Sequence, residues 1–418
     1  MSDASDATRR RRPRAATAPA NASARPPGWL RPSLPVALCV LLVSVISWMR
    51  VPLLPEMGED LQMAPSTLGW VVTAFGVGRL LMDMPAGRLV DRVPPLRLFA
   101  LAALMLSLAS LGMAVAQLPI VVIVACMLLG IGSATSNTTG MATMAGRATQ
   151  GRRGSAMALY SGALLIGQAL GPTLGGMLSS VQGWRLALLC GSGLALLLAA
   201  GAATAARRSA GRPAGTQRSP VPASGAPFSR VQHLVVFAVG FSVFFTVSSM
   251  PQVLVPLMGA DELGLTTVAI GLALGAGGVA RFIGALSTGV VSDRFSRKMA
   301  LLPCLALQAS GVAIIAVADS VTWWLVALVT MSLGSSGQGV CATMLGDRSD
   351  PKELGRVLGR YRFAGDIGLV SGPVLVALAY QHAGPTVAAL GTCAVLLAAL
   401  VTAALLLPET APRQVDAA

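Results

Sequence analysis

The amino-acid sequence predicts an all-α membrane protein, with twelve transmembrane helices in two pseudo-symmetric six-helix bundles. Three observations predict this fold class. The composition is 54% hydrophobic and only 11% charged, with a mean hydropathy of +0.71. Apolar runs of about 20 residues, long enough to cross a bilayer as helices, follow one another along the chain. A charged motif also occurs twice, 202 residues apart. No water-soluble fold of 418 residues could bury so much apolar surface.

The repeated motif marks the chain as two copies of one unit. Its shared residues are Gly87, Asp91, Arg92 and Arg97 in the first copy and Gly289, Asp293, Arg294 and Arg297 in the second. The same offset of 202 residues relates Arg79 to Arg281. Two copies of one unit, each with several apolar runs, are typical of membrane transporters.

The apolar runs are predicted to form six helices in each half. In the first half they span about 34–55, 67–87, 98–117, 119–144, 155–179 and 185–206. In the second half they span about 233–257, 265–289, 299–318, 321–345, 356–380 and 385–407. The predicted domains are therefore a basic disordered tail (1–33), an N-terminal bundle (34–206), a flexible linker (207–231), a C-terminal bundle (232–408) and a C-terminal tail (409–418).

Charge asymmetry predicts the orientation in the membrane. The basic residues lie in the N-terminal tail, the two repeated loops, the linker and the other loops on that side, whereas the alternate loops are short and nearly free of lysine and arginine. The positive-inside rule then places both termini and the linker in the cytoplasm. The net charge of +14 is mainly a signal of topology. It does not indicate nucleic-acid binding, because the basic residues are spread over separate loops.

The sequence indicates no metal site, cofactor or disulfide framework. Its six cysteines fall in or beside apolar runs without a CxxC pair, so we expect buried free thiols. Only His233 and His382 could add imidazole ligands. The glycine-rich segment 275–280 lies inside an apolar run with no strand before it, which argues against a dinucleotide-binding loop.

Two motifs carry a resemblance to a known family. The motif beginning at Gly87, between the predicted second and third helices, resembles the signature loop of the major facilitator superfamily, which also repeats it between the eighth and ninth helices. A second motif lies on the predicted fifth helix and resembles the one that marks proton-driven antiporters of that family; it comprises Gly167, Gly171, Pro172, Gly175 and Gly176. One departure is in the fourth helix, where segment 126–130 lacks both polar residues of the Arg-x-x-Gln-Gly pattern usual in such exporters.

The two motifs also have a direct physical interpretation. The loop around Asp91 is interpreted as a contact that holds one conformation, the alternative being a solvated turn that only satisfies topology. Three glycines spaced four apart give the fifth helix a face without side chains, which another helix can approach closely. Pro172 removes one backbone hydrogen bond and is expected to bend that helix.

Charged residues inside the predicted helices are few. Arg79 with Asp83, and Arg362 with Asp366, form two pairs that are each spaced i, i+4 and so share a helix face. Counted from the cytoplasmic ends, Asp83 and Arg362 lie roughly 6 and 9 Å deep, and Arg79 and Asp366 roughly 12 and 15 Å deep. The resemblance places these two helices opposite each other, so we expect crossed ion pairs, Asp83 with Arg362 and Arg79 with Asp366. The alternative keeps each pair within its own helix.

Two further arginines have no carboxylate nearby on their own helices. Arg281 has Ala285 where Arg79 has Asp83, so it is expected to face a carboxylate elsewhere, a water-filled cavity or an anionic substrate. Arg50 either lies in the cavity or reaches back to the outer membrane interface. The excess of positive charge in the membrane favours a neutral or anionic substrate over a lipophilic cation.

The resemblance implies a central cavity lined by the first, fourth, seventh and tenth helices. Candidate lining residues are Ser47, Trp48, Arg50, Asn137, Gln168, Phe244, Phe245, Gln252 and Gln338. Each could instead make a hydrogen bond or packing contact between helices.

Taken together, these features predict proton-coupled export of a small organic compound by alternating access. The gating and proton-coupling candidates are Arg79, Asp83, Arg281, Arg362 and Asp366. Uptake or exchange of a metabolite is the alternative, and a membrane-embedded enzyme or sensor is less favoured because no catalytic cluster is present. The preference for arginine over lysine indicates a GC-rich bacterial genome, hence a plasma (inner) membrane location, and we expect a monomer.

Overall fold

The computed structural model describes residues 30–147, 153–208, 228–349 and 353–409. Most of the predicted N-terminal tail and linker, and all but the first residue of the predicted C-terminal tail, lie outside these residues, whereas 30–33 are already part of the first helix. These described residues form helices and no strands. In the first half the helices are α1 (Leu30–Met49), η1 (Val51–Leu53), α2 (Leu54–Asp60), α3 (Pro65–Arg92), α4 (Pro95–Ala114), α5 (Pro119–Arg147) and α6 (Arg153–Arg208). In the second half they are α7 (Arg230–Ser249), η2 (Met250–Leu254), α8 (Val255–Asp261), α9 (Thr267–Arg294), α10 (Arg297–Ala316), α11 (Val321–Gly334), α12 (Gly337–Arg348) and α13 (Leu354–Leu406).

Within the described part of the chain, nine helical segments are long and apolar enough to cross a membrane. Two of them, α6 and α13, contain a glycine in the left-handed region, Gly183 at φ 77° and Gly384 at φ 81°, where the helix breaks. Each of these therefore counts as two spans. The helix α3, 28 residues long, is not among these nine segments, and its sequence contains charged and small residues that lower its hydropathy. With α3 added, the helices are consistent with the predicted twelve spans, and the all-α fold class is confirmed.

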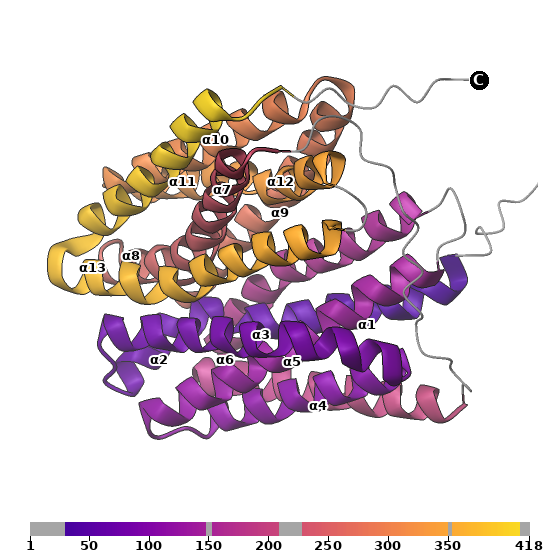
Figure 1. Cartoon of the computed structure of the whole chain (residues 1–418). Helices are drawn as coiled ribbons and strands as arrows, with labels where there is room; N and C mark the ends of the chain where they lie inside the picture. Colours follow the sequence, from indigo (N-terminus) through magenta and orange to yellow (C-terminus); the bar gives the residue numbers. More distant parts are fainter. Residues whose placement is uncertain (1–29, 148–152, 209–227, 350–352, 410–418) are drawn as a thin grey trace, which may run out of the picture.

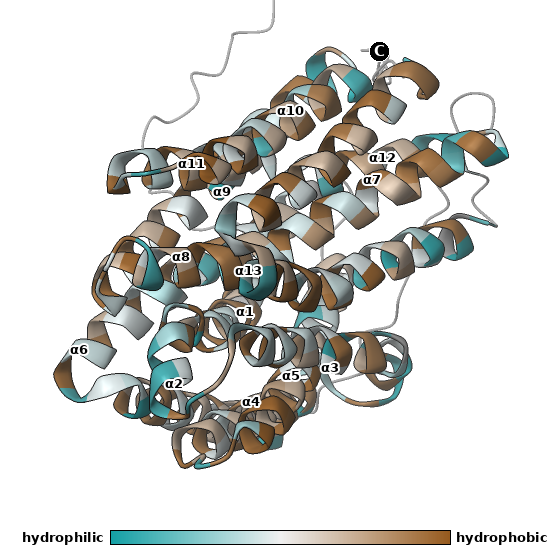
Figure 2. Ribbon diagram, turned by 90° about the vertical axis from the view of Figure 1, so that its left-hand side faces the viewer, coloured by the Kyte–Doolittle hydropathy of each residue, from teal (hydrophilic) through white to brown (hydrophobic). Residues whose placement is uncertain are grey.

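The helices form two bundles that lie side by side (Figure 1). One bundle contains α1 to α6 and the other α7 to α13. We call the end where α1 begins, α6 ends and α7 begins the terminal end, and the opposite end, with α2, α8 and both glycine breaks, the far end. Outward faces carry exposed apolar side chains such as Leu197, Leu234 and Leu405, and hydrophobic residues dominate the ribbons in Figure 2. Cys190 is exposed on such a face, contrary to the expectation that all six thiols are buried.

Three spans predicted as single helices are interrupted. The first contains the short 3₁₀ helix η1 at Pro52, and the seventh contains the π-helical segment η2 at Pro251. Proline removes a backbone donor, so the regular hydrogen-bond ladder shifts at both places. The tenth span is divided between α11 and α12 at Ser335 and Ser336.

A close crossing of α3 and α5 positions Arg79. A Cβ on Gly78 would meet the carbonyl oxygen of Met127, and one on Gly130 would meet the carbonyl oxygen of Phe75. Only glycine allows α3 and α5 to approach so closely. As a result Arg79 lies beside Ser133, with Nη1 donating to Oγ at 3.4 Å.

The second half repeats this arrangement. Gly284 packs against the carbonyl of Leu333, and Arg281 Nε donates to Ser335 Oγ at 2.8 Å. Both the arginines and the serines of the two bonds are related by the offset of 202 residues. The internal repeat of the sequence is therefore a repeat of side-chain contacts as well.

Substitution at the crossing gives a test of the packing. Gly130→Val should lower the thermal unfolding midpoint in detergent, because overpacking of a tight contact costs about 1–3 kcal/mol. The matched control is Gly193→Ala on α6, where an added Cβ meets nothing within 4 Å and the midpoint should not change. Equal midpoints for the two variants would contradict the crossing described here.

Candidate transport site

Charges from the two bundles meet between α3 and α13. Arg362 Nε lies 3.8 Å from Asp83 Oδ2 and 3.8 Å from Asp366 Oδ1. Asp83 belongs to the first bundle, whereas Arg362 and Asp366 belong to the second. The Asp366 side chain is 4% exposed and that of Arg362 is 48% exposed. One guanidinium at the edge of the bundle thus contacts two carboxyl groups, one from each half.

Arg79 is held differently from the expectation. Of the two crossed ion pairs, the structure has Asp83 with Arg362. It has no ion pair between Arg79 and Asp366 among the described side chains. Arg362 also contacts Asp366 on its own helix, which is one of the two pairs expected under the alternative. Arg79 instead donates to Ser133, and its Cζ lies 5.9 Å from the centre of the Phe75 ring. Its Nε is buried without a hydrogen-bond acceptor.

Arg281 lies at the contact between the bundles. Besides its bond to Ser335, it donates from Nη1 to Gln168 Oε1 of α6 at 3.2 Å. No described carboxylate forms an ion pair with it. Arg281 is thus held by neutral acceptors from both halves.

Arg50 is buried, and the predicted alternative of reaching the membrane interface is wrong. Its side chain is 1% exposed because the break at η1 turns it inward. It donates to Ser47 O at 2.7 Å, to Cys126 Sγ at 3.2 Å and to Gln252 Oε1 at 3.2 Å. Its Cζ also lies 4.4 Å from the centre of the Phe75 ring, a cation–π contact. The bond to Gln252 in η2 joins the two halves.

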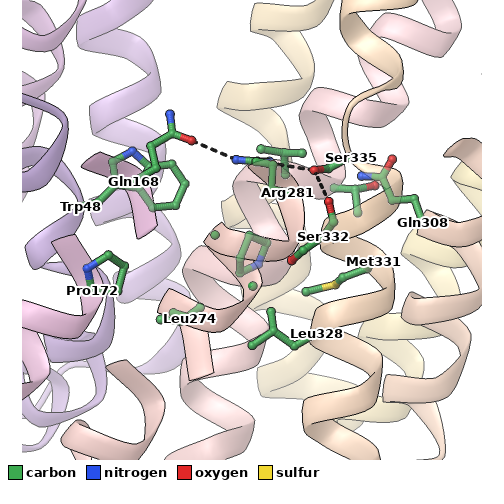
Figure 3. Close-up of a pocket in the computed structure, with 15 residues that line it drawn as sticks. Trp48, Gln168, Pro172, Leu274, Arg281, Gln308, Leu328, Met331, Ser332 and Ser335 are labelled. Carbon is green, nitrogen blue, oxygen red and sulfur yellow. Dashed lines mark hydrogen bonds between the residues drawn. The ribbon is translucent and has the colours of Figure 1, made fainter. Parts of the chain in front are cut away.

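Two cavities that share lining residues lie between the bundles. The central pocket (Figure 3) has a volume of about 40 Å³ and is lined by Trp48, Gln168, Leu274, Arg281, Gln308 and Met331 among others. A wider cavity of about 410 Å³, which we call the vestibule, extends toward the terminal end and reaches Asp293 and Arg297. Arg281 and Ser335 line both cavities. Arg281 therefore stands where the vestibule meets the central pocket.

The sequence candidates for the cavity divide into two groups. Trp48 and Gln168 line the central pocket and Gln338 lines the vestibule. The other candidates line neither of these two cavities in the described structure: Ser47, Arg50, Asn137, Phe244, Phe245 and Gln252. Most of them make contacts within or between helices. Ser47, for example, donates to Val43 O at 2.8 Å.

Gln308 is a lining residue that sequence reasoning missed. It lies on α10, is 1% exposed and leaves its Oε1 buried without a hydrogen-bond partner. A lone amide in an otherwise apolar span was a visible signal, but the ninth span was not expected to reach the cavity. A buried amide oxygen without a donor is unusual and requires an explanation, and here the residue belongs to the lining of the central pocket.

The glycine motif of α6 joins helices on two sides. Gly171 faces α1, where an added Cβ would lie 2.6 Å from Val45 O, and Gly167 and Gly175 face the same helix. Gly176 faces α9 instead, where a Cβ would lie 2.6 Å from Thr267 O. Pro172 packs on α9 through its carbonyl oxygen against Gly271. The motif thus fixes α6 against its own bundle and against the other.

The far end is closed by polar contacts across the halves. Glu56 of α2 accepts hydrogen bonds from Trp184 N at 3.0 Å, from Ser179 Oγ at 2.9 Å and from Thr267 Oγ1 at 3.3 Å. Ser179 and Trp184 flank the break in α6, while Thr267 begins α9. This carboxylate therefore ties together one end of both bundles, and sequence reasoning did not single it out.

The second signature loop is an ion-pair cluster at the terminal end. Arg297 donates to Asp293 Oδ1 at 2.7 Å and to Asp347 Oδ2 at 3.1 Å, which links α9 and α10 to α12. Arg294 is exposed at the end of α9. In the first copy, the side chains of Asp91, Arg92 and Arg97 are exposed, and Gly87 has open space around it, as Gly289 has.

Comparison with known proteins gives one family. A model described as Major Facilitator Superfamily matches residues 36–287 and 234–418. The chain is 29% identical over 170 residues to "Uncharacterized MFS-type transporter EfpA" of Mycobacterium tuberculosis, covering 40% of this chain and 32% of that protein, so the match spans about a third of that relative. It is 23% identical over 332 residues to "Multidrug resistance protein 1" of Bacillus subtilis, covering 78% of this chain and 83% of that protein.

A solved structure has the same fold. The crystal structure of a bacterial homologue of the human lysosomal transporter Spinster, in an inward-facing and occupied conformation, superposes with a TM-score of 0.72 at 14% identity. The superposition covers 91% of this chain and 97% of that chain.

A double-mutant cycle tests the contact between Arg50 and Gln252. Gln252→Leu should destabilise the folded protein, because it leaves a buried guanidinium nitrogen without its acceptor, at about 1–3 kcal/mol. Arg50→Met removes the buried cation itself, so the double variant should be less destabilised than the sum of the singles. The measurement is unfolding in detergent. Additive effects would mean that the two side chains do not interact.

Proposed function

Since this chain belongs to the major facilitator superfamily, we propose that it is a proton-coupled antiporter that exports a small organic compound by alternating access. Similarity to a relative named for multidrug resistance supports export. The single observation that carries proton coupling is the cluster in which Arg362 contacts Asp83 and Asp366 from the two halves.

The cluster offers a physical route from protonation to movement. With both carboxyl groups ionised, Arg362 is attracted to one group on each bundle, which favours contact between α3 and α13. A proton on Asp83 removes the attraction between the bundles and leaves that within α13. A proton on Asp366 has the opposite effect: it removes the attraction within α13, so Arg362 interacts more strongly with Asp83 of the other bundle. Proton binding thereby changes the balance between joined and separated bundles.

The cavities supply the path for the substrate. The far end is packed, with Glu56 bonded to Thr267 and Arg50 bonded to Gln252 across the halves. The vestibule leads from Arg281 toward the terminal end. In the proposed cycle a compound enters from the terminal end, and release follows when the far-end contacts open and the bundles close at the terminal end. On closure, the Asp83–Arg362 separation, which is 3.8 Å in this structure, would shorten to a hydrogen-bonded ion pair.

The proposed location is a bacterial plasma (inner) membrane, with the terminal end in the cytoplasm. Basic residues gather at that end in the sequence, which supports a cytoplasmic position of both termini by the positive-inside rule. Substrate entering from the vestibule would then leave the cell. We propose that the functional unit is the monomer, because each chain contains both bundles and the cavity between them.

Inside-out vesicles with a pH-sensitive dye test the proposal. A preformed proton gradient should collapse when a transported compound is added to vesicles with the wild-type protein, and Asp83→Asn or Asp366→Asn should abolish that response. The control is Glu262→Gln, an exposed carboxylate in the loop after α8, which should respond as the wild type does. A compound that accumulates with no change in the proton gradient would favour uptake or exchange of a metabolite.

A charge exchange tests the contact between the bundles. Asp83→Arg should abolish transport, because it places two guanidinium groups together, and adding Arg362→Asp should restore a measurable part of the transport rate. Asp366→Arg with Arg362→Asp is the comparison within α13. Restoration only by this second pair would assign Arg362 to its own helix and contradict the proposed closure between bundles.

A further inference from the structure

The equivalent arginines of the two halves have different neighbours. Arg79 and Arg281 are related by the repeat and both donate to a serine, but only the first has a carboxyl group one turn further along its helix. That position is Asp83 in α3 and Ala285 in α9. The repeat therefore allows an internal comparison: the arginine occurs in both copies, whereas a carboxylate one turn further along the helix occurs only in the first, where it contacts Arg362.

The unmatched charge lies at a cavity. A charge inside a bilayer is strongly unfavourable unless it is paired or hydrated. The acceptors of Arg281 are the neutral groups of Ser335 and Gln168, which satisfy Nε and Nη1 without neutralising the charge. In the part of the chain that the structure describes, Nη2 has no acceptor. The remaining nitrogen and the net charge are thus available to a ligand.

A second polar group lines the same pocket without a partner. Gln308 is buried from α10, and its Oε1 has no donor. Its terminal amide can present either an acceptor or two donors, since the oxygen and nitrogen exchange by rotation of the side chain. The pocket thus has a charged donor, Arg281, on the side of Gln168 and an adaptable amide, Gln308, on the other side of Ser335. Figure 3 shows both side chains at the pocket.

The rest of the pocket is apolar. Trp48, Leu274, Leu328 and Met331 line it, and Pro172 of the glycine motif closes one side. At about 40 Å³ it admits a small group, whereas the adjoining vestibule of about 410 Å³ has room for the remainder of a larger molecule. Because Arg281 stands between the two spaces, a charged group bound there can have apolar parts on either side.

We propose that this site binds amphipathic organic anions, with the carboxylate or sulfonate of the compound on Arg281 and its apolar part against Trp48, Leu274 and Met331. The proposal rests on the export function proposed above, whose substrate class it names. The anion would place beside Arg281 a negative charge that Ala285, the counterpart of Asp83, does not provide.

Three probes with one apolar body separate charge from shape. We would measure binding of 2-naphthoate, neutral 2-naphthamide and cationic 2-naphthylmethylammonium to the full chain in detergent by calorimetry. The wild type should bind the anion at least about tenfold more tightly than the amide, since only the anion adds charge attraction to its hydrogen bonds with Arg281. Arg281→Gln should lose that preference, and Arg281→Lys should keep part of it. Equal binding of anion and amide by the wild type overturns the proposal.

Position 285 gives a test that leaves Arg281 in place. Ala285→Asp puts a carboxylate one turn from Arg281, as in the first half, and should weaken anion binding about tenfold while amide binding stays within about twofold. Ala285→Asn has nearly the same shape without the charge and should leave the preference for the anion unchanged. If the Asp and Asn variants bind the anion equally, Arg281 is not its counter-charge and the proposal fails.

The binding tests are independent of proton coupling. If substitutions at positions 281 and 285 both change anion binding, but the anion does not collapse a proton gradient in vesicles, the site is retained and the antiport function is rejected. Gradient collapse by compounds of any charge, unaffected by Ala285→Asp, would retain the function and reject the anionic substrate class.

Discussion

The structure depends on one constraint: every charge placed inside an apolar slab needs a partner or water. Four arginines meet this constraint in different ways. Arg50 is surrounded by neutral acceptors and an aromatic ring, Arg79 has a serine and the same ring, and Arg362 contacts two carboxyl groups. Arg281 alone stands at the junction of two cavities. The positions of these side chains define which parts of the interface are closed, which can exchange partners and which receive a ligand.

Glycine determines how those side chains reach one another. The helix α6 has glycines toward α1 and a further glycine toward α9, so a single helix fixes the distance within one bundle and between both. Without side chains in the way, backbones come close enough for Gln168 of α6 to reach Arg281 of α9. A rigid-body movement of one bundle must therefore slide along this contact, and the hydrogen bonds beside it change with that movement.

Composition, apolar runs and the repeat were sufficient to predict the fold class, because each depends on the sequence alone. The rotation of each helix was not predictable, since the apolar runs have little periodicity in a membrane. Arg50 illustrates this: a proline-induced break turns it inward, where it meets Gln252. Gln308 was missed because the ninth span, on which it lies, was not expected to reach the cavity. The approach of Asp83 to Arg362 was foreseen from charge and depth, whereas the bond of Arg79 to Ser133 follows from a glycine crossing between helices far apart in sequence.

The bond between Arg50 and Gln252 joins nearly equivalent positions of the two repeats: the bonded residues are 202 apart, whereas α2 and α8 begin 201 apart, at Leu54 and Val255. Equivalent positions touch only on the axis that relates the copies, as a residue meets its own counterpart across the two-fold of an isologous dimer. The pseudo-dyad of this molecule therefore passes close to that contact. A dimer of two copies of the first half would set arginine near arginine there, and two buried cations repel. Covalent fusion of the halves removes that restriction, because a single chain can place a cation on one side of the axis and a neutral acceptor on the other.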